Sequence, residues 1–278
     1  MSRNFLSEIV ARKREAAAAL RAGASGARLQ GRAFELRKDA EPHRLLKALQ
    51  AATSPVKIIA EFKRKSPSAG LLRRDPAPQE FAQAYQRGGA CAISVLTEEQ
   101  FFNGSLSDLA AIRQATRLPI LQKDFIIDAT QIYKAAVARA DAVLLIVAAL
   151  DDDSLGQLRR IAEDELGLDA LVEAHTREEL TRAINAGARL IGINNRDLRT
   201  LEVSPRASEA LVAHIPAGYM RVSESGLHDA GSLRRLQQLG FDAFLIGAAL
   251  MRAHDPEATL RALINHATVK PNLAQRRS

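Results

Sequence analysis

Apolar and polar positions alternate along the chain in eight repeats that begin near residue 56. Each repeat has a short apolar run, a loop, and then a stretch with apolar residues at helical spacing. The run 143–147 is apolar throughout, which is typical of a parallel strand covered on both faces. Strands that alternate with helices indicate βαβ units and a parallel sheet. The predicted strands begin near Val56, Ala90, Pro119, Ala142, Asp169, Arg189, Tyr219 and Asp242.

Eight such units in about 210 residues fit the lower size range of a (β/α)₈ barrel. An open, doubly wound sheet is the alternative, but the first predicted strand leads into no G-x-G-x-x-G loop and the chain has no P-loop. The predicted fold class is therefore α/β, a single (β/α)₈ TIM barrel with an N-terminal helical extension.

The extension covers residues 1–52. Phe5, Leu6, Ile9 and Val10 recur at helical spacing, residues 42–52 predict a second helix, and residues 22–33 are rich in Gly, Ala and Ser and predict a loop. We expect one domain, residues 1–267, that includes this extension. Residues 268–278 lose periodicity and are expected to form a disordered tail.

The net charge of +7 is concentrated at the two ends of the chain. Residues 1–50 hold eleven Lys and Arg against five Asp and Glu, and residues 268–278 add +3, which leaves −2 for the rest. Aromatic residues do not interleave with the basic ones, as they do in many proteins that bind single strands, so a solvated basic helix is the preferred interpretation. No apolar stretch reaches membrane-spanning length and no secretory signal is recognisable, which favours a soluble cytoplasmic protein.

Acidic and basic residues stand at the ends of the first, third and fifth predicted strands. The active site of such a barrel lies at the carboxyl ends of its strands. Period-two alternation places Glu61 and Lys63 on one face of the first strand, with Lys123 and Glu173 on the corresponding faces of the third and fifth. Because alternate strands supply each interior layer, these groups predict an acid–base set. A structural network of ion pairs is the alternative.

Three further strand ends suit anions. Asn194 and Arg196 share a face after the sixth strand, where amide and guanidinium groups suit a carboxylate, although Arg196 could instead pair with Asp197. Turns containing Gly226 and Gly247 run from the seventh and eighth strands into helices, and helix N-termini bind phosphate. Helix packing that needs small residues is the alternative for both glycines.

Two other features carry less weight. Phe101 and Phe102 follow the second strand and could belong either to the core or to an apolar wall for a substrate ring. No His, Asp or Glu cluster has metal-ligand spacing, the single cysteine excludes an internal disulfide, and no Ser or Cys has a partnered base.

Taken together and in order, the strand ends resemble the indole-3-glycerol phosphate synthase family. Seven motifs in register on seven strands cover nearly the whole chain, and the helical extension is also a family feature. The matching segments are Glu61-Phe62-Lys63-Arg64-Lys65-Ser66-Pro67-Ser68, Ser94-Val95-Leu96-Thr97-Glu98, Lys123-Asp124-Phe125, Leu171-Val172-Glu173, Gly192-Ile193-Asn194-Asn195-Arg196-Asp197-Leu198, Ser223-Glu224-Ser225-Gly226 and Phe244-Leu245-Ile246-Gly247.

The resemblance implies a substrate, 1-(2-carboxyphenylamino)-1-deoxyribulose 5-phosphate, whose ring closure loses carbon dioxide and water in tryptophan biosynthesis. By the same resemblance Lys123 is the general acid, and Glu173 is the general base and cation stabiliser. Lys63 binds an anion and could serve as a second acid. The groups expected to orient these residues or the substrate carboxylate are Glu61, Asn194 and Arg196.

The resemblance also implies a substrate-binding set. Phe102 and Phe125 would line a slot for the aromatic ring. Position 248 is Ala where relatives can have a hydroxyl or acidic side chain, so a side-chain contact to the phosphate is missing there. The remaining members of the set are Ser66 together with the phosphate-binding Ser225, Gly226, Gly247 and the backbone of Ala248.

The chemistry is polar, so we expect a carbon–carbon lyase that uses neither metal nor cofactor. The expected partner is a small anionic substrate, with no nucleic acid or membrane, and the expected state is a monomer or weak homodimer. A phosphoribosylanthranilate isomerase-like barrel would share the phosphate turns but has little use for the pair Lys123 and Glu173. A basic nucleic-acid-binding protein is the alternative from another class, and steep salt dependence would reveal it.

Overall fold

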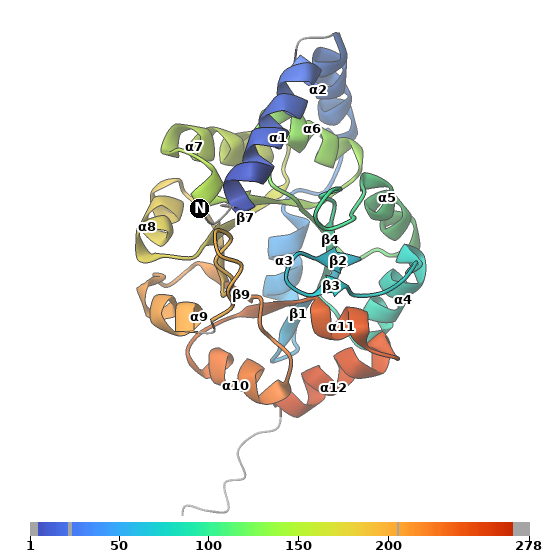
Figure 1. The fold of residues 1–278 in the computed structure, drawn as a ribbon, viewed down its shortest axis with the longest axis vertical. Coiled ribbons are helices and arrows are strands. Elements are labelled where there is room, and N and C mark those ends of the chain that lie inside the picture. The colour runs from blue at the N-terminus through green and yellow to red at the C-terminus, as the bar shows by residue number, and fades with distance from the viewer. Residues whose placement is uncertain (1–4, 22–23, 205, 269–278) are drawn as a thin grey trace, which may run out of the picture.

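Eight parallel strands close into a barrel around which the helices form a ring (Figure 1). The computed structural model describes residues 5–21, 24–204 and 206–268. Each strand pairs with its neighbours in chain order, and the last strand pairs with the first. The predicted fold class is confirmed. The barrel strands are β1 (Lys57–Phe62), β4 (Ala92–Leu96), β5 (Ile120–Lys123), β6 (Ala142–Ile146), β7 (Asp169–Ala174), β8 (Leu190–Asn194), β9 (Met220–Glu224) and β10 (Ala243–Ile246).

A helix follows every barrel strand, and a short antiparallel hairpin, β2 (Lys65–Ser66) with β3 (Gly70–Leu71), extends the loop after β1. Three short turns of 3₁₀ or π helix are η1 (Val147–Ala149), η2 (Ile161–Glu165) and η3 (Val212–His214). The α-helices are α1 (Phe5–Arg21), α2 (Ala24–Arg37), α3 (Arg44–Ala51), α4 (Pro78–Gly88), α5 (Leu106–Ala115), α6 (Ala129–Val137), α7 (Asp152–Arg160), α8 (Arg177–Asn185), α9 (Arg206–Leu211), α10 (Ala230–Gln238), α11 (Ala248–Arg252) and α12 (Pro256–Thr268).

Short polar side chains fix where the outer helices begin. Thr176 and Glu179 form a reciprocal capping box at the start of α8. Each such cap satisfies backbone N–H groups that the first helical turn leaves unpaired, so the chain turns from strand to helix at a defined residue. The same role is taken at α5, α6, α7 and α10 by Ser105, Asp128, Asp151 and Asp229.

Apolar side chains of the strands divide between two cores. Outward-facing residues such as Ile93 and Val172 pack under the helices. Inward-facing residues such as Ile59, Leu121 and Leu171 fill the barrel interior. The alternation predicted for the strands is therefore the alternation between the two cores.

The N-terminal extension contacts both ends of the barrel. Phe5 of α1 packs on Phe101 and Phe125, which lie in loops at the carboxyl ends of β4 and β5. At the opposite end, Leu45 and Leu49 of α3 are fully buried against the inward-facing strand residues. The first and third helices thus pack at opposite ends of the barrel, and α1 and α2 project beyond the helix ring beside α6 (Figure 1).

The loop predicted for residues 22–33 is wrong in large part, because α2 begins at Ala24. Ala33 is fully buried, and Phe34 lies with its ring centroid 6.2 Å from that of Tyr133 in α6. Packing against α6 therefore compensates for the weak helix propensity of the glycines and Ser25 in this stretch. Gly26 stands where a side chain would crowd the backbone carbonyl of Leu20 at the end of α1.

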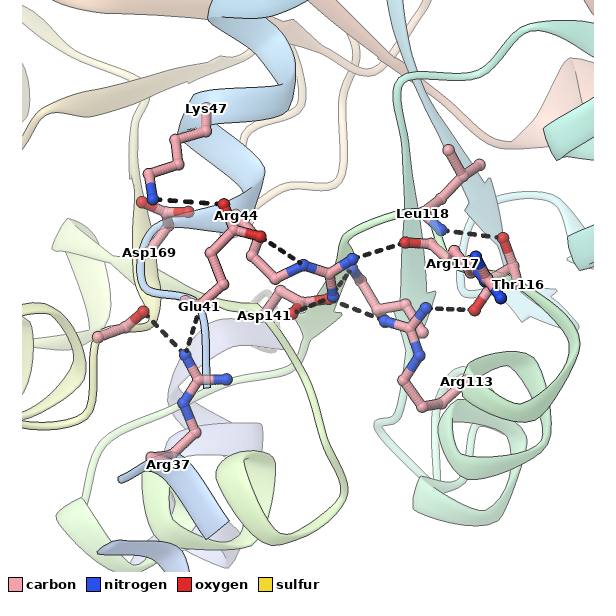
Figure 2. Close-up of polar contacts among 12 residues, drawn as sticks. Arg37, Glu41, Arg44, Lys47, Arg113, Thr116, Arg117, Leu118, Asp141 and Asp169 are labelled. Atoms are coloured by element: carbon pink, nitrogen blue, oxygen red, sulfur yellow. Dashed lines mark hydrogen bonds and ion pairs between the residues drawn. The ribbon is translucent and has the colours of Figure 1, made fainter. Parts of the chain in front are cut away.

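Charged residues form a hydrogen-bonded network where the strands begin (Figure 2). Asp141 accepts bonds from Arg44 at 2.7 Å, from Arg113 at 2.9 Å and from the backbone N–H of Ile120 at 2.9 Å. Asp169 accepts the backbone N–H of Leu46 at 3.0 Å, at the start of α3. These bonds join α3 to the bottom of the barrel.

The C-terminal tail and the absence of a membrane span were also expected from the sequence. Helix α12 continues to Thr268, and the rest of the expected tail lies outside the described part of the chain. Within that described part, none of the helices combines the length and apolar character that a membrane crossing requires.

Candidate active site

A cavity of about 180 Å³ opens at the carboxyl ends of the strands. Its wall contains every residue that the sequence predicted for the site, drawn from segments up to 187 positions apart (Glu61 to Ala248). Those thirteen residues are Glu61, Lys63, Ser66, Phe102, Lys123, Phe125, Glu173, Asn194, Arg196, Ser225, Gly226, Gly247 and Ala248. The closed barrel is the physical reason for this convergence, because all eight strands end at the same rim.

One interior layer at this rim is ionisable. Lys123 Nζ lies 3.5 Å from Glu173 Oε2 and 3.3 Å from Glu224 Oε2. Glu61 forms an ion pair with Lys63. Glu61, Lys123, Glu173 and Glu224 belong to β1, β5, β7 and β9, which are the first, third, fifth and seventh strands of the barrel. They therefore form a layer of the kind that alternate strands build in these barrels.

Glu224 is the member of this layer that sequence reasoning missed. Its segment was assigned to the phosphate turn on the strength of Ser225 and Gly226. The carboxylate is 1% exposed, and neither oxygen has a hydrogen-bond partner among the described residues. The layer rule that grouped Glu61, Lys123 and Glu173 also requires a fourth residue from the seventh strand, so the signal was present in the sequence.

The environments of two carboxyl groups in the layer move their pKa values in opposite directions. Burial would raise the pKa of Glu61, but Lys63, Lys123 and Arg196 together hold it below its ordinary value. Burial raises the pKa of Glu224 to about 8, and Lys123 offsets this only in part because Glu173 and Glu61 add repulsion. The two environments thus push the pKa values of these carboxyls apart, which is the arrangement that separates acid from base roles.

Lys123 stays protonated in this layer. Burial alone would lower its pKa, but the nearby carboxylates of Glu224, Glu173 and Glu61 raise that pKa above the ordinary lysine value. Its side chain is only 15% exposed. The amine is therefore a proton donor held at the floor of the cavity.

Two glycines make room for the carboxylates. A Cβ atom at Gly192 of β8 would overlap the carboxylate of Glu224, and one at Gly247 would overlap that of Glu61. Gly247 was predicted from the sequence as part of an anion site, and the nearby carboxylate of Glu61 is a second reason why this position must be glycine. The backbone here must pass too close to a functional group to carry a side chain.

The two glycine turns differ in structure. Ser225 and Gly226 both adopt positive φ, at 66° and 72°, but α10 begins only at Ala230 and its N-terminus is already capped by Asp229. Helix α11 begins directly after Gly247 and has no side-chain cap. Free N–H groups for an anion are therefore provided by α11, whereas the β9 turn shapes the adjacent wall.

Aromatic rings form one side of the cavity. Phe102 and Phe125 lie with ring centroids 6.2 Å apart and planes inclined by 36°. Phe5 of α1 contacts both edge-on from behind, at 6.3 and 6.5 Å. Phe101 packs on Phe5 at 5.0 Å and does not line the cavity, so of the two consecutive phenylalanines only Phe102 does.

Arg196 links two loops across the cavity mouth. Its Nη1 donates to Ser68 Oγ and to the carbonyl of Leu201, both at 2.8 Å. Ser68 in turn lies 3.2 Å from Ser66 Oγ. Burial lowers the pKa of Arg196, and Glu61 partly opposes this effect. The suggested pair with Asp197 does not occur, because Asp197 accepts from the backbone N–H of Arg199 instead.

Asn194 is oriented by its neighbours. Its Oδ1 accepts the backbone N–H of Arg196 at 2.9 Å, and its own carbonyl accepts a bond of 2.7 Å from His175 Nδ1. His175 lines a smaller adjoining cavity rather than the main one. Among the described residues, no group of three or more His, Cys, Asp or Glu is arranged to hold a metal ion.

The fold and the site together are those of a (β/α)₈-barrel enzyme, with a layer of carboxyl and amine groups and an uncapped helix start at one rim. Residues 6–263 match the family model described as indole-3-glycerol phosphate synthase. The chain belongs to the indole-3-glycerol phosphate synthase family. Its activity is that of this synthase, a carboxy-lyase of tryptophan biosynthesis.

Curated relatives agree over most of the chain. The indole-3-glycerol phosphate synthase of Carboxydothermus hydrogenoformans is 48% identical over 241 residues, covering 83% of this chain and 91% of the relative. That of Kineococcus radiotolerans is 42% identical over 259 residues, covering 93% and 94%. That of Micrococcus luteus is 46% identical over 222 residues, covering 80% and 82%.

Solved structures with low sequence identity share the fold alone. Thiamine phosphate pyrophosphorylase from Pyrococcus furiosus has a TM-score of 0.57 at 18% identity, covering 77% of this chain and 96% of that one. KGPDC from Streptococcus mutans has a TM-score of 0.59 at 16% identity, covering 76% and 97%. At these identities the likeness concerns the barrel and not its chemistry.

Proposed function

We propose that the cavity binds 1-(2-carboxyphenylamino)-1-deoxyribulose 5-phosphate and closes its ring with loss of carbon dioxide and water. The observation that carries this proposal is the position of Lys123. Its protonated amine lies between Glu173 and Glu224, in a cavity that also contains an aromatic wall and the uncapped start of α11. The substrate has an aromatic ring, a carbonyl to be protonated and a phosphate, which correspond to these three features.

In the ring-closing step, Lys123 donates a proton to the substrate carbonyl oxygen while the aromatic ring attacks the carbonyl carbon. Attack breaks the aromaticity of the ring and places positive charge on the anilino nitrogen. The adjacent carboxylates stabilise that charge without reorganisation, since the barrel already holds them in place. Loss of carbon dioxide follows because the cationic intermediate accepts the electron pair of the breaking carbon–carbon bond.

In the dehydration step, the hydroxyl formed from the substrate carbonyl accepts a proton from Lys123 and leaves as water, while Glu173 removes a proton from the adjacent methylene carbon so that the double bond forms. Glu224, with a pKa of about 8, can both hold and release a proton near neutrality. It lies 3.3 Å from Lys123 Nζ, close enough to reprotonate the amine after each turnover. Glu61 remains ionised and holds Lys63 at the strand end.

The two anionic ends of the substrate are assigned to opposite sides of the cavity. The phosphate is assigned to the backbone N–H groups of α11 at Gly247 and Ala248, beside the turn at Ser225 and Gly226. The carboxylate is assigned to Arg196 and Asn194. Both protein bonds of the Arg196 side chain use Nη1, so its other N–H groups can form a charge-assisted bond to the substrate. Lys63 and Ser66 complete the polar wall between these two ends.

The assay that tests the proposal is the fluorescence of indole formation when the purified chain is given this substrate. Lys123→Ala should lower turnover by about 10²-fold or more, the scale of a lost general acid, while the melting temperature stays near that of the unsubstituted protein. Turnover close to normal in this variant would remove Lys123 from the mechanism.

We also propose that one chain suffices for the reaction, as a monomer or weak homodimer in the cytoplasm, since one chain supplies all thirteen predicted residues. Every step is a proton transfer or a polar bond change, so we expect activity to survive exhaustive chelation. Several basic residues of the extension are paired within the chain, including Lys13 with Asp124 and Arg21 with Asp128. This pairing argues against a nucleic-acid-binding role for the extension.

A further inference from the structure

Asp124, which directly follows Lys123, is the centre of a buried polar cluster. It is 6% exposed. Its Oδ1 accepts the backbone N–H of Phe125 at 2.7 Å and lies 2.5 Å from Nζ of Lys13 in α1. Its Oδ2 accepts the hydroxyl of Thr97 at 2.7 Å. The N-terminal helix is therefore ion-paired to the residue next to the proposed general acid.

Thr97 extends the cluster to the other side of Lys123. Its hydroxyl accepts from Gln122 Nε2 at 3.0 Å, and its backbone N–H donates to the carbonyl of Lys123 at 3.0 Å. Gln122, Lys123 and Asp124 are thus each bonded to Thr97. The cluster clamps the peptide segment that carries the Lys123 side chain.

The sheet itself holds this segment on one side only. Lys123 is in register with Leu96 of β4, whereas the pairing of β5 with β6 ends at Gln122. The last residue of β5 therefore lacks a strand partner toward β6. A strand end with one free side needs other contacts to keep its side chain at a fixed place.

We propose that Lys13 is a positioning residue for Lys123, acting from the N-terminal helix through Asp124 and Thr97. This inference rests on the proposed general-acid role of Lys123. A misplacement of about 1 Å can cost as much as about 10²-fold in rate, so loosening the clamp lowers turnover even though Lys13 touches no reacting group.

The experiment compares Lys13→Met with Arg21→Met. Both residues lie on α1 and both form ion pairs with an aspartate that follows β5, but the partner of Arg21 is Asp128, the cap of α6, which is not bonded to Lys123 or its neighbours. Lys13→Met should lower kcat by about 10-fold, with a smaller change in KM. Arg21→Met should stay within about two-fold of the unsubstituted protein, and Lys13→Arg should recover most of the lost kcat.

Thr97→Val tests the same cluster at the residue that joins Asp124 to Gln122. It replaces Lys13→Met as the test if that variant does not fold. It removes the hydroxyl that joins Asp124 to Gln122 and should also lower kcat more than it changes KM. The two substitutions combined should cost less than the product of their separate effects, because they break one cluster.

Two outcomes would overturn the inference. One is a kcat within about two-fold of normal for Lys13→Met or Thr97→Val. The other is an equal loss in Arg21→Met, since general docking of α1 would then explain both. Lys123→Ala, measured alongside, separates the two proposals. Normal turnover in that variant defeats the proposed function, whereas its loss together with a normal Lys13→Met defeats only the positioning role.

Discussion

The two ends of the barrel both carry buried charge, but they satisfy it differently. At the bottom, both oxygens of Asp141 accept hydrogen bonds, from two arginines and a backbone N–H (Figure 2). At the top, Glu224 is equally buried, yet neither of its oxygens has a hydrogen-bond partner among the described residues. Its nearest cation, Lys123, is shared with Glu173.

The difference follows from the cost of buried charge. A buried carboxylate is tolerated when hydrogen bonds replace the water that it has lost, and otherwise its pKa rises. At the bottom, both oxygens of Asp141 are bonded, and its pairing with Arg44 holds α3 in the barrel. The top layer has a surplus of acid, and burial with repulsion from Glu173 raises the pKa of Glu224. Stability is thus concentrated at one end and reactivity at the other.

The largest expected effect is on the bottom network. Asp141→Ala removes the acceptor shared by Arg44, Arg113 and the Ile120 N–H, although both arginines keep a backbone carbonyl acceptor. Removing one partner of a buried pair costs about 3–5 kcal/mol, so the free energy of unfolding should fall by this amount in a urea titration. The turnover of the folded variant should remain within about two-fold of normal.

Glu35→Gln is the matched control. Its pair with Arg32 is on the solvent side of α2, with both side chains more than half exposed, so its loss should change stability very little. A large fall in turnover for Asp141→Ala, without a fall in stability, would reverse the assignment of roles to the two ends.

The sequence predicted the barrel well because parallel strands that are buried on both faces consist of nearly continuous apolar residues. The run that begins at Ala142 starts the strand at that residue, and the run near Ala90 starts its strand at Ala92. Because burial on both faces requires apolar residues at every position, the local pattern of apolar runs is enough to indicate the parallel barrel. Helix α2 was not predicted because Ser25, Gly26 and Gly31 interrupt a stretch whose other residues favour a helix, and its packing against α6 is a tertiary contact that the local pattern does not show.

Within the site, strand-end residues could be predicted because alternation fixes which side chains point inward. Glu224 was overlooked although it obeys the same rule. The bond from Arg196 to Ser68 joins loops 128 positions apart, and no periodicity describes loop contacts of that kind. Likewise, the contact of Phe5 behind Phe102 depends on how α1 crosses the barrel rim.

The second prediction concerns the top layer. Glu224→Gln keeps the shape of the side chain but can neither release a proton nor carry charge. If Glu224 reprotonates Lys123, kcat should fall by about 10²-fold, at the lower end of general acid–base contributions. Steady-state kinetics of indole formation measures this effect, and a kcat within about three-fold of normal would contradict the role.

The same variant has a signature in stability. Between its ordinary pKa of 4.5 and the raised value of about 8, Glu224 holds a proton in the folded chain that the unfolded chain releases. The free energy of unfolding of the unsubstituted protein therefore declines across this window as pH rises. Relative to it, Glu224→Gln should gain stability from pH 4.5 to about 8.

Glu61→Gln is the control of opposite sign. The folded pKa of Glu61 is lowered, so this group contributes stability above its ordinary pKa and loses it as pH falls through the folded value. Glu61→Gln should be less stable than the unsubstituted protein at neutral pH. Identical pH profiles for the two variants would show that the layer does not separate their pKa values.

The smallest expected effect is at the anion site. Ala248→Ser adds a hydroxyl at the first residue of α11, whose N-terminus has no side-chain cap. A hydrogen bond contributes about 0.5–1.5 kcal/mol net, so KM for the substrate should fall by about three-fold while kcat is unchanged. Ala249→Ser is the control, because Ala249 does not line the cavity and its KM should not move. An unchanged KM in Ala248→Ser would place the phosphate elsewhere.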